Sequence, residues 1–155
     1  MKLRISIAAL LLACFAAPLA IAQSGVDVAA EPYAPRLGDI MNTLQLRHLK
    51  LIFAGRAQNW ELADFELRQL TEGLSEAALL YSGIPATNVT TLATPNRSIA
   101  DAIKAKDVRK FTDAVGQFTD GCNACHQTMG RKFIVIRLPT EQPFTNQVFA
   151  PQGKK

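Results

Sequence analysis

The chain has 155 residues, of which 48% are hydrophobic, and a formal net charge of +4. This length fits one domain and excludes a large multidomain enzyme. The apolar residues are concentrated at the start of the chain, where 18 of the first 22 residues are hydrophobic.

Residues 1–22 have the pattern of a cleaved signal peptide. A short basic stretch, Lys2 to Arg4, precedes an apolar run, and Ala20 and Ala22 form a small-x-small cleavage site. The run is too short for a membrane-spanning helix, which needs about 20 apolar residues. A lipoprotein anchor and an uncleaved anchor are the alternatives. We expect cleavage after residue 22 and export to the periplasm.

Cleavage would leave 133 residues with a net charge of +2. A domain so close to neutral argues against a nucleic-acid partner, since such binding usually needs a clustered basic face. Cleavage also removes Cys14 and leaves Cys122 and Cys125 as the remaining cysteines. One pair of cysteines does not indicate the disulfide framework that is common in small exported domains.

After an extended lead-in over residues 23–35, the sequence predicts a four-helix bundle over residues 36–132. The first helix begins near Leu37, and its apolar stripe alternates spacings of four and three residues, interrupted only by His48. This stripe consists of Leu37, Met41, Leu44, His48, Leu51 and Gly55. A second stripe of the same kind runs from Trp60 to Tyr81 and stops before a Gly-Ile-Pro sequence.

The next segment is rich in Thr, Asn and Pro, so residues 85–95 are predicted to form a loop. A short third helix is predicted to start at a cap on Asn96 or Ser98 and to end near Lys106. The fourth helix is predicted to begin at an N-cap on Asp107 and to span about 33 Å. Its stripe consists of Val108, Phe111, Val115, Phe118, Cys122, Cys125 and Met129.

These elements predict an all-α fold, an antiparallel four-helix bundle whose third helix is short. Residues 133–155 follow as an irregular C-terminal tail. A Phe-Ile-Val-Ile run and three prolines in this tail predict an extended strap that lies over the bundle.

The segment Cys122-Asn123-Ala124-Cys125-His126 has the C-x-x-C-H pattern of c-type haem attachment. Two thiols three positions apart share one face of a helix, so both can reach the vinyl groups on one edge of a porphyrin and form thioethers. The adjacent imidazole then lies under the iron, where a histidine is the usual proximal ligand. The motif therefore predicts one covalently attached haem c, bound by the four-helix bundle of residues 36–132.

Two other kinds of site share part of this pattern. A thioredoxin-type dithiol would need a βαβ arrangement around the C-x-x-C sequence, and the helical stripes offer none. A zinc site would need four ligands, whereas His48 is the only histidine outside the motif and no second C-x-x-C exists.

The export signal, the four helices, Met41 in the first helix and C-x-x-C-H in the last together resemble the cytochrome c′ and cytochrome c-556 family over roughly Leu37 to Lys132. The resemblance implies that Cys122 and Cys125 form the thioethers. It also implies that His126 is the proximal iron ligand. In this family a methionine at the position of Met41 is typical of the low-spin c-556 type, and an apolar residue leaves the iron five-coordinate, as in the c′ type. The resemblance therefore makes Met41 the candidate distal ligand, the sixth ligand of the iron.

Two other residues bear on the iron ligands. His48 lies about 10 Å from Met41 along the same stripe, so both cannot bind one iron. His48 is either an alternative ligand or a hydrogen-bonded histidine near the haem edge, and Met129 is expected to be core. Three features depart from the family: the short third helix, the long tail and the position of Arg131. In the family a basic residue usually follows the haem histidine at a fixed spacing, and Arg131 lies one residue farther from His126 than that.

We expect a one-electron carrier between exported or membrane-bound redox proteins, and not an enzyme. The alternative is a five-coordinate haem protein that binds NO or CO. A peroxidase is disfavoured because no distal acid–base pair is evident in the sequence. The resemblance also implies a possible homodimer.

Overall fold

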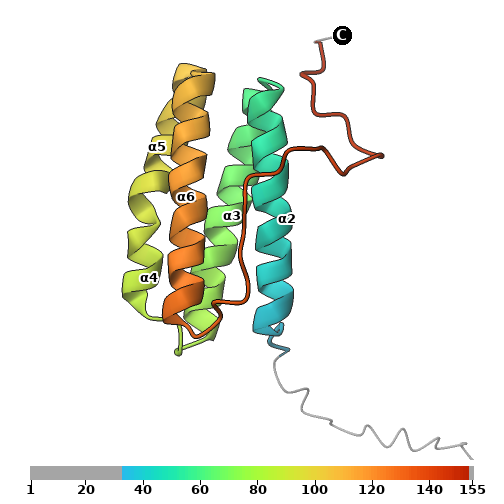
Figure 1. Cartoon of the computed structure of the whole chain (residues 1–155). Helices are drawn as coiled ribbons and strands as arrows, with labels where there is room; N and C mark the ends of the chain where they lie inside the picture. Colours follow the sequence, from blue (N-terminus) through green and yellow to red (C-terminus); the bar gives the residue numbers. More distant parts are fainter. Residues whose placement is uncertain (1–32, 154–155) are drawn as a thin grey trace, which may run out of the picture. The chain divides into compact units, whose positions relative to one another are not determined.

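Four helical rods pack side by side in the computed structural model, which describes residues 33–153 (Figure 1). Helices make up 67% of these residues, and the same residues contain no strand, so the predicted all-α bundle is confirmed. The predicted signal peptide and most of the lead-in lie outside the described residues. No helix within 33–153 is long and apolar enough to cross a membrane.

The first two rods are α2 (Leu37–Arg56) and α3 (Trp60–Leu80). Their bounds match the predicted stripes, because the stripe residues are the ones that pack into the core. Asn59 caps α3 by accepting a hydrogen bond from the backbone N–H of Leu62 at 3.1 Å. The two helices therefore form a hairpin with a tight connection.

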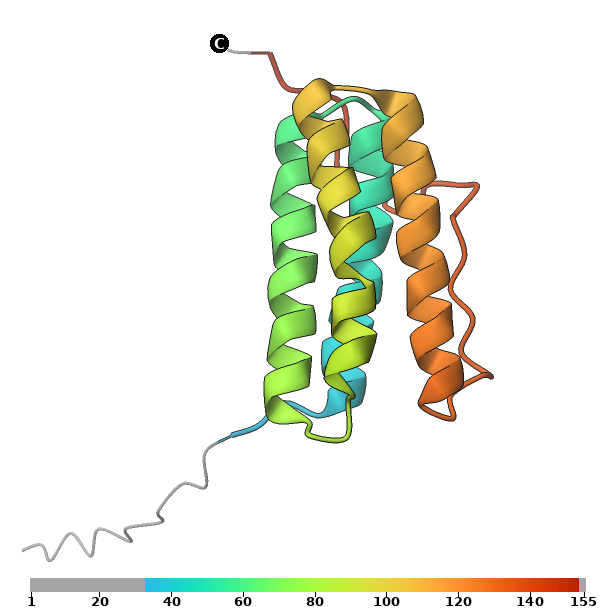
Figure 2. The ribbon, with the colours of Figure 1, turned by 90° about the vertical axis from the view of Figure 1, so that its left-hand side faces the viewer.

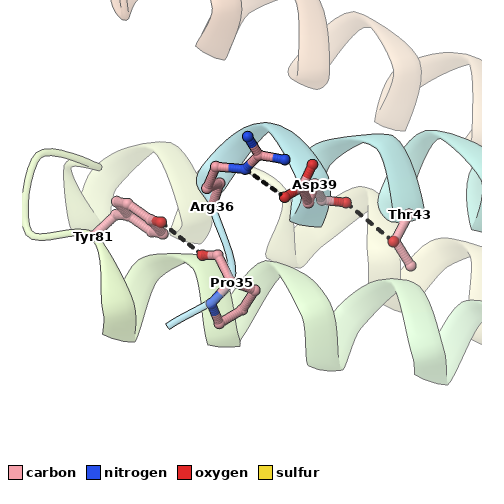
Figure 3. Close-up of polar contacts among 5 residues, drawn as sticks. All are labelled: Pro35, Arg36, Asp39, Thr43 and Tyr81. Atoms are coloured by element: carbon pink, nitrogen blue, oxygen red, sulfur yellow. Dashed lines mark hydrogen bonds and ion pairs between the residues drawn. The ribbon is translucent and has the colours of Figure 1, made fainter. Parts of the chain in front are cut away.

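The open end of this hairpin is closed by a single side chain (Figure 3). The hydroxyl of Tyr81, just past α3, donates to the carbonyl of Pro35, just before α2, at 2.7 Å. The first turn of α2 is further held by an Arg36–Asp39 ion pair at 2.9 Å. These contacts set where α2 begins.

The loop predicted over residues 85–95 is wrong, because the third rod is helical there. Residues 86–91 form helix α4 (Ala86–Thr91) instead of a loop, and α5 (Ala93–Ala105) follows after Leu92. The predicted caps Asn96 and Ser98 are wrong, since Leu92 precedes the first turn of α5. Pro95 lies in that turn, where its missing N–H costs no helical hydrogen bond. α5 is shorter than α3 and α6, as predicted, but α4 lengthens the same rod.

The fourth rod, α6 (Val108–Thr128), carries the C-x-x-C-H motif in its last two turns. Asp107 caps it as predicted, accepting from the backbone N–H of Lys110 at 3.0 Å. The preceding Lys106 has a positive φ of 55°, which turns the chain sharply from α5 into α6. The predicted stripe of α6 is buried from Phe111 through Phe118.

The core is tightest where α2 approaches α6. A Cβ on Gly55 would lie 2.1 Å from Cε1 of Phe111, so only glycine allows this contact. Trp60 packs edge-on against the same ring, with centroids 5.9 Å apart. Gly55 lies at the C-terminal end of α2 and Phe111 near the start of α6, so the motif at the C-terminal end of α6 lies at the other end of the bundle.

The tail after α6 is irregular and runs back alongside the bundle (Figures 1 and 2). Arg56 donates to the carbonyl of Pro139 at 2.7 Å. Further along, Phe149 is only 7% exposed and packs against Phe53, with ring centroids 5.8 Å apart. The tail is thus attached to α2 at two points.

Candidate functional site

A cavity of about 420 Å³ lies at the end of the bundle where α2 begins and α6 ends. This volume is within the range of about 300–1,000 Å³ that small-molecule and cofactor sites occupy. Its walls come from α2, α3, α4, α6 and the tail, and they are mainly apolar. The apolar lining residues are Leu37, Met41, Leu44, Leu70, Leu74, Ala77, Ile84, Val89, Leu92, Phe118, Met129, Ile134 and Ile136.

The three motif residues Cys122, Cys125 and His126 all line this cavity. Both cysteines are free and partly buried. Burial raises the pKa of the Cys122 thiol to about 12, and the nearby Cys125 adds to that effect. Burial also raises the pKa of Cys125. A reactive redox dithiol needs a lowered pKa, so this environment does not favour thioredoxin-like chemistry.

His126 is oriented by the tail. Its Nδ1 lies 3.0 Å from the carbonyl oxygen of Ile134. A carbonyl only accepts hydrogen bonds, so Nδ1 carries the proton and donates it. The other nitrogen, Nε2, then keeps its lone pair and is the atom able to bind a metal.

Two methionines line the cavity from different helices. Met41 is a partly buried residue of α2 that packs against the core. Met129 ends α6, three residues after His126, and is half-buried at the cavity wall instead of in the core as predicted. Met41 is thus the methionine that approaches the motif from another helix.

His48 occupies a polar position within the buried part of the cavity wall. Its side chain is 4% exposed, and Nε2 lies 2.9 Å from the hydroxyl oxygen of Thr119. Thr119 donates its one hydroxyl proton to the carbonyl of Val115 at 2.8 Å, so it accepts from His48. Burial lowers the pKa of His48 from 6.5 to about 4. His48 is therefore a neutral histidine that donates a hydrogen bond to Thr119.

Comparison of the chain with family models, curated proteins and solved structures found no match. Within residues 33–153, no three His, Cys, Asp or Glu side chains converge so as to hold a metal ion. The two thiols and the imidazole are instead spread along one side of α6, a distribution that suits an extended ligand better than a bare ion.

Sequence reasoning missed several polar residues around the site. Thr119 and Asn123 face partners on α2 and on the tail. Asn88 of α4 donates to the hydroxyl of Thr128 at 3.1 Å and also lines the cavity. Thr119 lies one helical turn before Cys122, next to the apolar stripe, and this spacing is the one signal that could have found it.

Proposed function

We propose that this chain is an exported, monohaem c-type cytochrome that carries one electron between exported or membrane-bound redox proteins. One observation carries the proposal: the two thiols and the imidazole of the motif face the same apolar cavity as Met41. In this proposal Cys122 and Cys125 hold the haem as thioethers. His126 would bind the iron from α6, and Met41 would bind it from α2.

The residues present fit such a group. The cavity has the volume of a cofactor site and mainly apolar walls, and a porphyrin is a large apolar ligand. The donor set offers two thiols on one helical face, one imidazole nitrogen with a free lone pair, and the thioether of Met41 on another helix. A bound haem would supply an iron that cycles between the ferric and ferrous states.

The chain's own residues would then favour electron transfer. A methionine sulfur is a soft ligand and raises the reduction potential relative to a second histidine. The apolar walls keep water away from the iron, which limits solvent reorganisation when the charge changes. Cys125 and His126 line the cavity and are only partly buried, so a redox partner could approach the haem from their side.

The state of His48 supports a carrier over a peroxidase. Its Nε2–H is used by Thr119, and its pKa of about 4 keeps it neutral. A peroxidase needs a distal group that takes up and returns protons near the working pH. The buried, hydrogen-bonded imidazole of His48 is poorly suited to that task.

Haem staining after denaturing electrophoresis tests the covalent attachment. A thioether-linked haem remains on the denatured chain, so the unmodified protein should stain. The Cys122→Ala/Cys125→Ala double variant should not stain, whereas Met129→Ala, at the same cavity, should stain as strongly as the unmodified protein. An unstained wild-type chain that has been exported and matured would refute the proposal.

The ferric absorption spectrum tests the distal ligand. We expect a low-spin spectrum with the weak long-wavelength sulfur-to-iron charge-transfer band, and we expect Met41→Ala to abolish this band. Met129→Ala is the matched control, because it removes a thioether from the same cavity without touching α2. A high-spin spectrum in the unmodified protein would instead support the five-coordinate alternative that binds NO or CO.

A further inference from the structure

The tail makes a second set of contacts close to the motif. Asn123, the first residue between the two cysteines, pairs its side-chain amide with the backbone of Ile136. Its Nδ2 donates to the Ile136 carbonyl at 2.8 Å, and its Oδ1 accepts from the Ile136 N–H at 2.8 Å. One asparagine thus replaces both hydrogen bonds that a neighbouring strand would have made.

This pairing sets the register of the tail against α6. Asn123 and His126 are three residues apart and share a face of the helix. Ile134 and Ile136 are two residues apart in an extended segment and present equivalent backbone groups to that face. With Asn123 on Ile136, the carbonyl of Ile134 meets Nδ1 of His126 at 3.0 Å. The tail runs antiparallel to the motif, with three hydrogen bonds between them.

The same segment completes the cavity. Ile134 and Ile136 both line it, together with Arg131 at the start of the tail. The segment is anchored on its far side by the hydrogen bond from Arg56 to the carbonyl of Pro139. The carbonyl that meets His126 therefore belongs to a stretch held at both ends.

We propose that Asn123 is a positioning residue for His126, acting through the tail. The two hydrogen bonds of Asn123 fix the backbone of Ile136. The fixed backbone in turn keeps the Ile134 carbonyl within hydrogen-bond distance of Nδ1 of His126. The carbonyl fixes the proton on Nδ1, fixes the ring plane and makes Nε2 a stronger electron donor. This inference rests on the proposed function, since it assigns Nε2 of His126 to the iron.

Loss of the Asn123 pair should change the reduction potential in a defined direction. A stronger proximal donor stabilises ferric iron more than ferrous iron, so freeing the tail should raise the potential. Outer-shell partners of metal-bound histidines are worth about 10-fold to 100-fold in affinity or activity. At the lower limit, a tenfold change in the ferric-to-ferrous preference equals about 59 mV for one electron.

The test compares Asn123→Ala with Asn96→Ala in the full-length, haem-loaded protein. Asn96 is the control because it is also half-buried, and its alanine variant loses a side-chain hydrogen bond, from Thr71 at 3.1 Å, on α5 away from the tail. We expect the potential of Asn123→Ala to rise by about 59 mV and that of Asn96→Ala to stay unchanged. Chymotrypsin cleavage after the exposed Phe133 should also become faster in Asn123→Ala only.

The two readouts separate positioning from simple tethering of the tail. Faster cleavage with an unchanged potential would overturn the inference, because the tail would then be loose without any effect on His126. If Asn123→Ala fails to mature, Ile136→Pro is measured instead. This variant removes the backbone N–H of Ile136 that donates to Asn123. A raised potential would again support the inference, and faster cleavage with an unchanged potential would again overturn it. A wild-type chain that takes no haem stain would refute the proposed function itself, which is a different result from an unmoved potential in a stained variant.

Discussion

Acid should destabilise this protein through one buried histidine. His48 is 4% exposed, and burial holds its pKa at about 4 in the folded state against 6.5 in the unfolded state. Above pH 6.5 both states carry a neutral imidazole, and the folded state bears no penalty. As the pH falls below 6.5, the unfolded state takes up a proton that the folded state does not bind until about pH 4, so the free energy of unfolding falls.

The size of the effect follows from the two pKa values. A difference of about 2.5 units, from 6.5 to about 4, corresponds to about 3 kcal/mol at 1.36 kcal/mol per unit. This stability is fully present above pH 6.5 and is lost as the pH falls through about 4. Most of the loss therefore lies within that window.

The assay compares the unmodified protein with His48→Gln, whose amide can still donate to Thr119 but does not titrate. Guanidinium unfolding is followed by far-ultraviolet circular dichroism at pH 7 and at pH 4.5. Carboxylates that titrate over this range affect both proteins equally, so the informative quantity is the difference between their unfolding free energies. We expect this difference to change by about 2 to 3 kcal/mol in favour of His48→Gln at pH 4.5. A difference that is the same at both pH values would refute the reasoning.

Two further predictions concern packing and charge. Gly55→Ala should lower the unfolding free energy by about 1–3 kcal/mol, because the new Cβ would lie 2.1 Å from Phe111. In Gly116→Ala the new Cβ would meet no atom within 4 Å, so this control should raise the unfolding free energy by about 0.5–1 kcal/mol in the same guanidinium assay. A similar loss of unfolding free energy in the two variants would contradict the packing argument. Arg47→Met should cost about 3–5 kcal/mol, because it leaves the buried carboxylate of Glu66 without the guanidinium that lies 3.1 Å away. The Arg47→Met/Glu66→Met double variant should recover most of this loss. If Arg47→Met alone were as stable as the unmodified protein, the buried carboxylate of Glu66 would not depend on Arg47.

The helices that matched prediction are those whose apolar stripes pack into the core. The stripes of α2, α3 and α6 have long, regular spacing, which is the strongest signal of an amphipathic helix. The failure at α4 has a local cause. Thr90 and Thr91 both donate hydroxyl protons to the carbonyl of Thr87, at 3.0 and 2.7 Å, so these residues satisfy their polar groups within the helix. Their composition indicates a loop, but these local hydrogen bonds are compatible with a helix, and composition alone does not separate the two.

The motif was predictable because its chemistry is local, and its surroundings were not. The cysteines and the histidine lie within five consecutive residues, and helical spacing alone places them on one wall. The partners of the site come from distant parts of the chain. His48 and Thr119 are 71 residues apart, and Asn123 meets Ile136 through a tail without periodic structure. No pattern in one sequence specifies such pairs, because they depend on which surfaces the folded bundle brings together.

The attachment of the tail also implies an order of assembly. Arg56 and Pro139 are 83 residues apart, and closing such a loop is entropically expensive compared with pairing neighbouring helices. The tail buries few large side chains, so we expect it to dock last and to detach first when the protein opens locally. One wall of the cavity would then be added after the bundle has formed, and until that moment the thiols of Cys122 and Cys125 are accessible from the tail side.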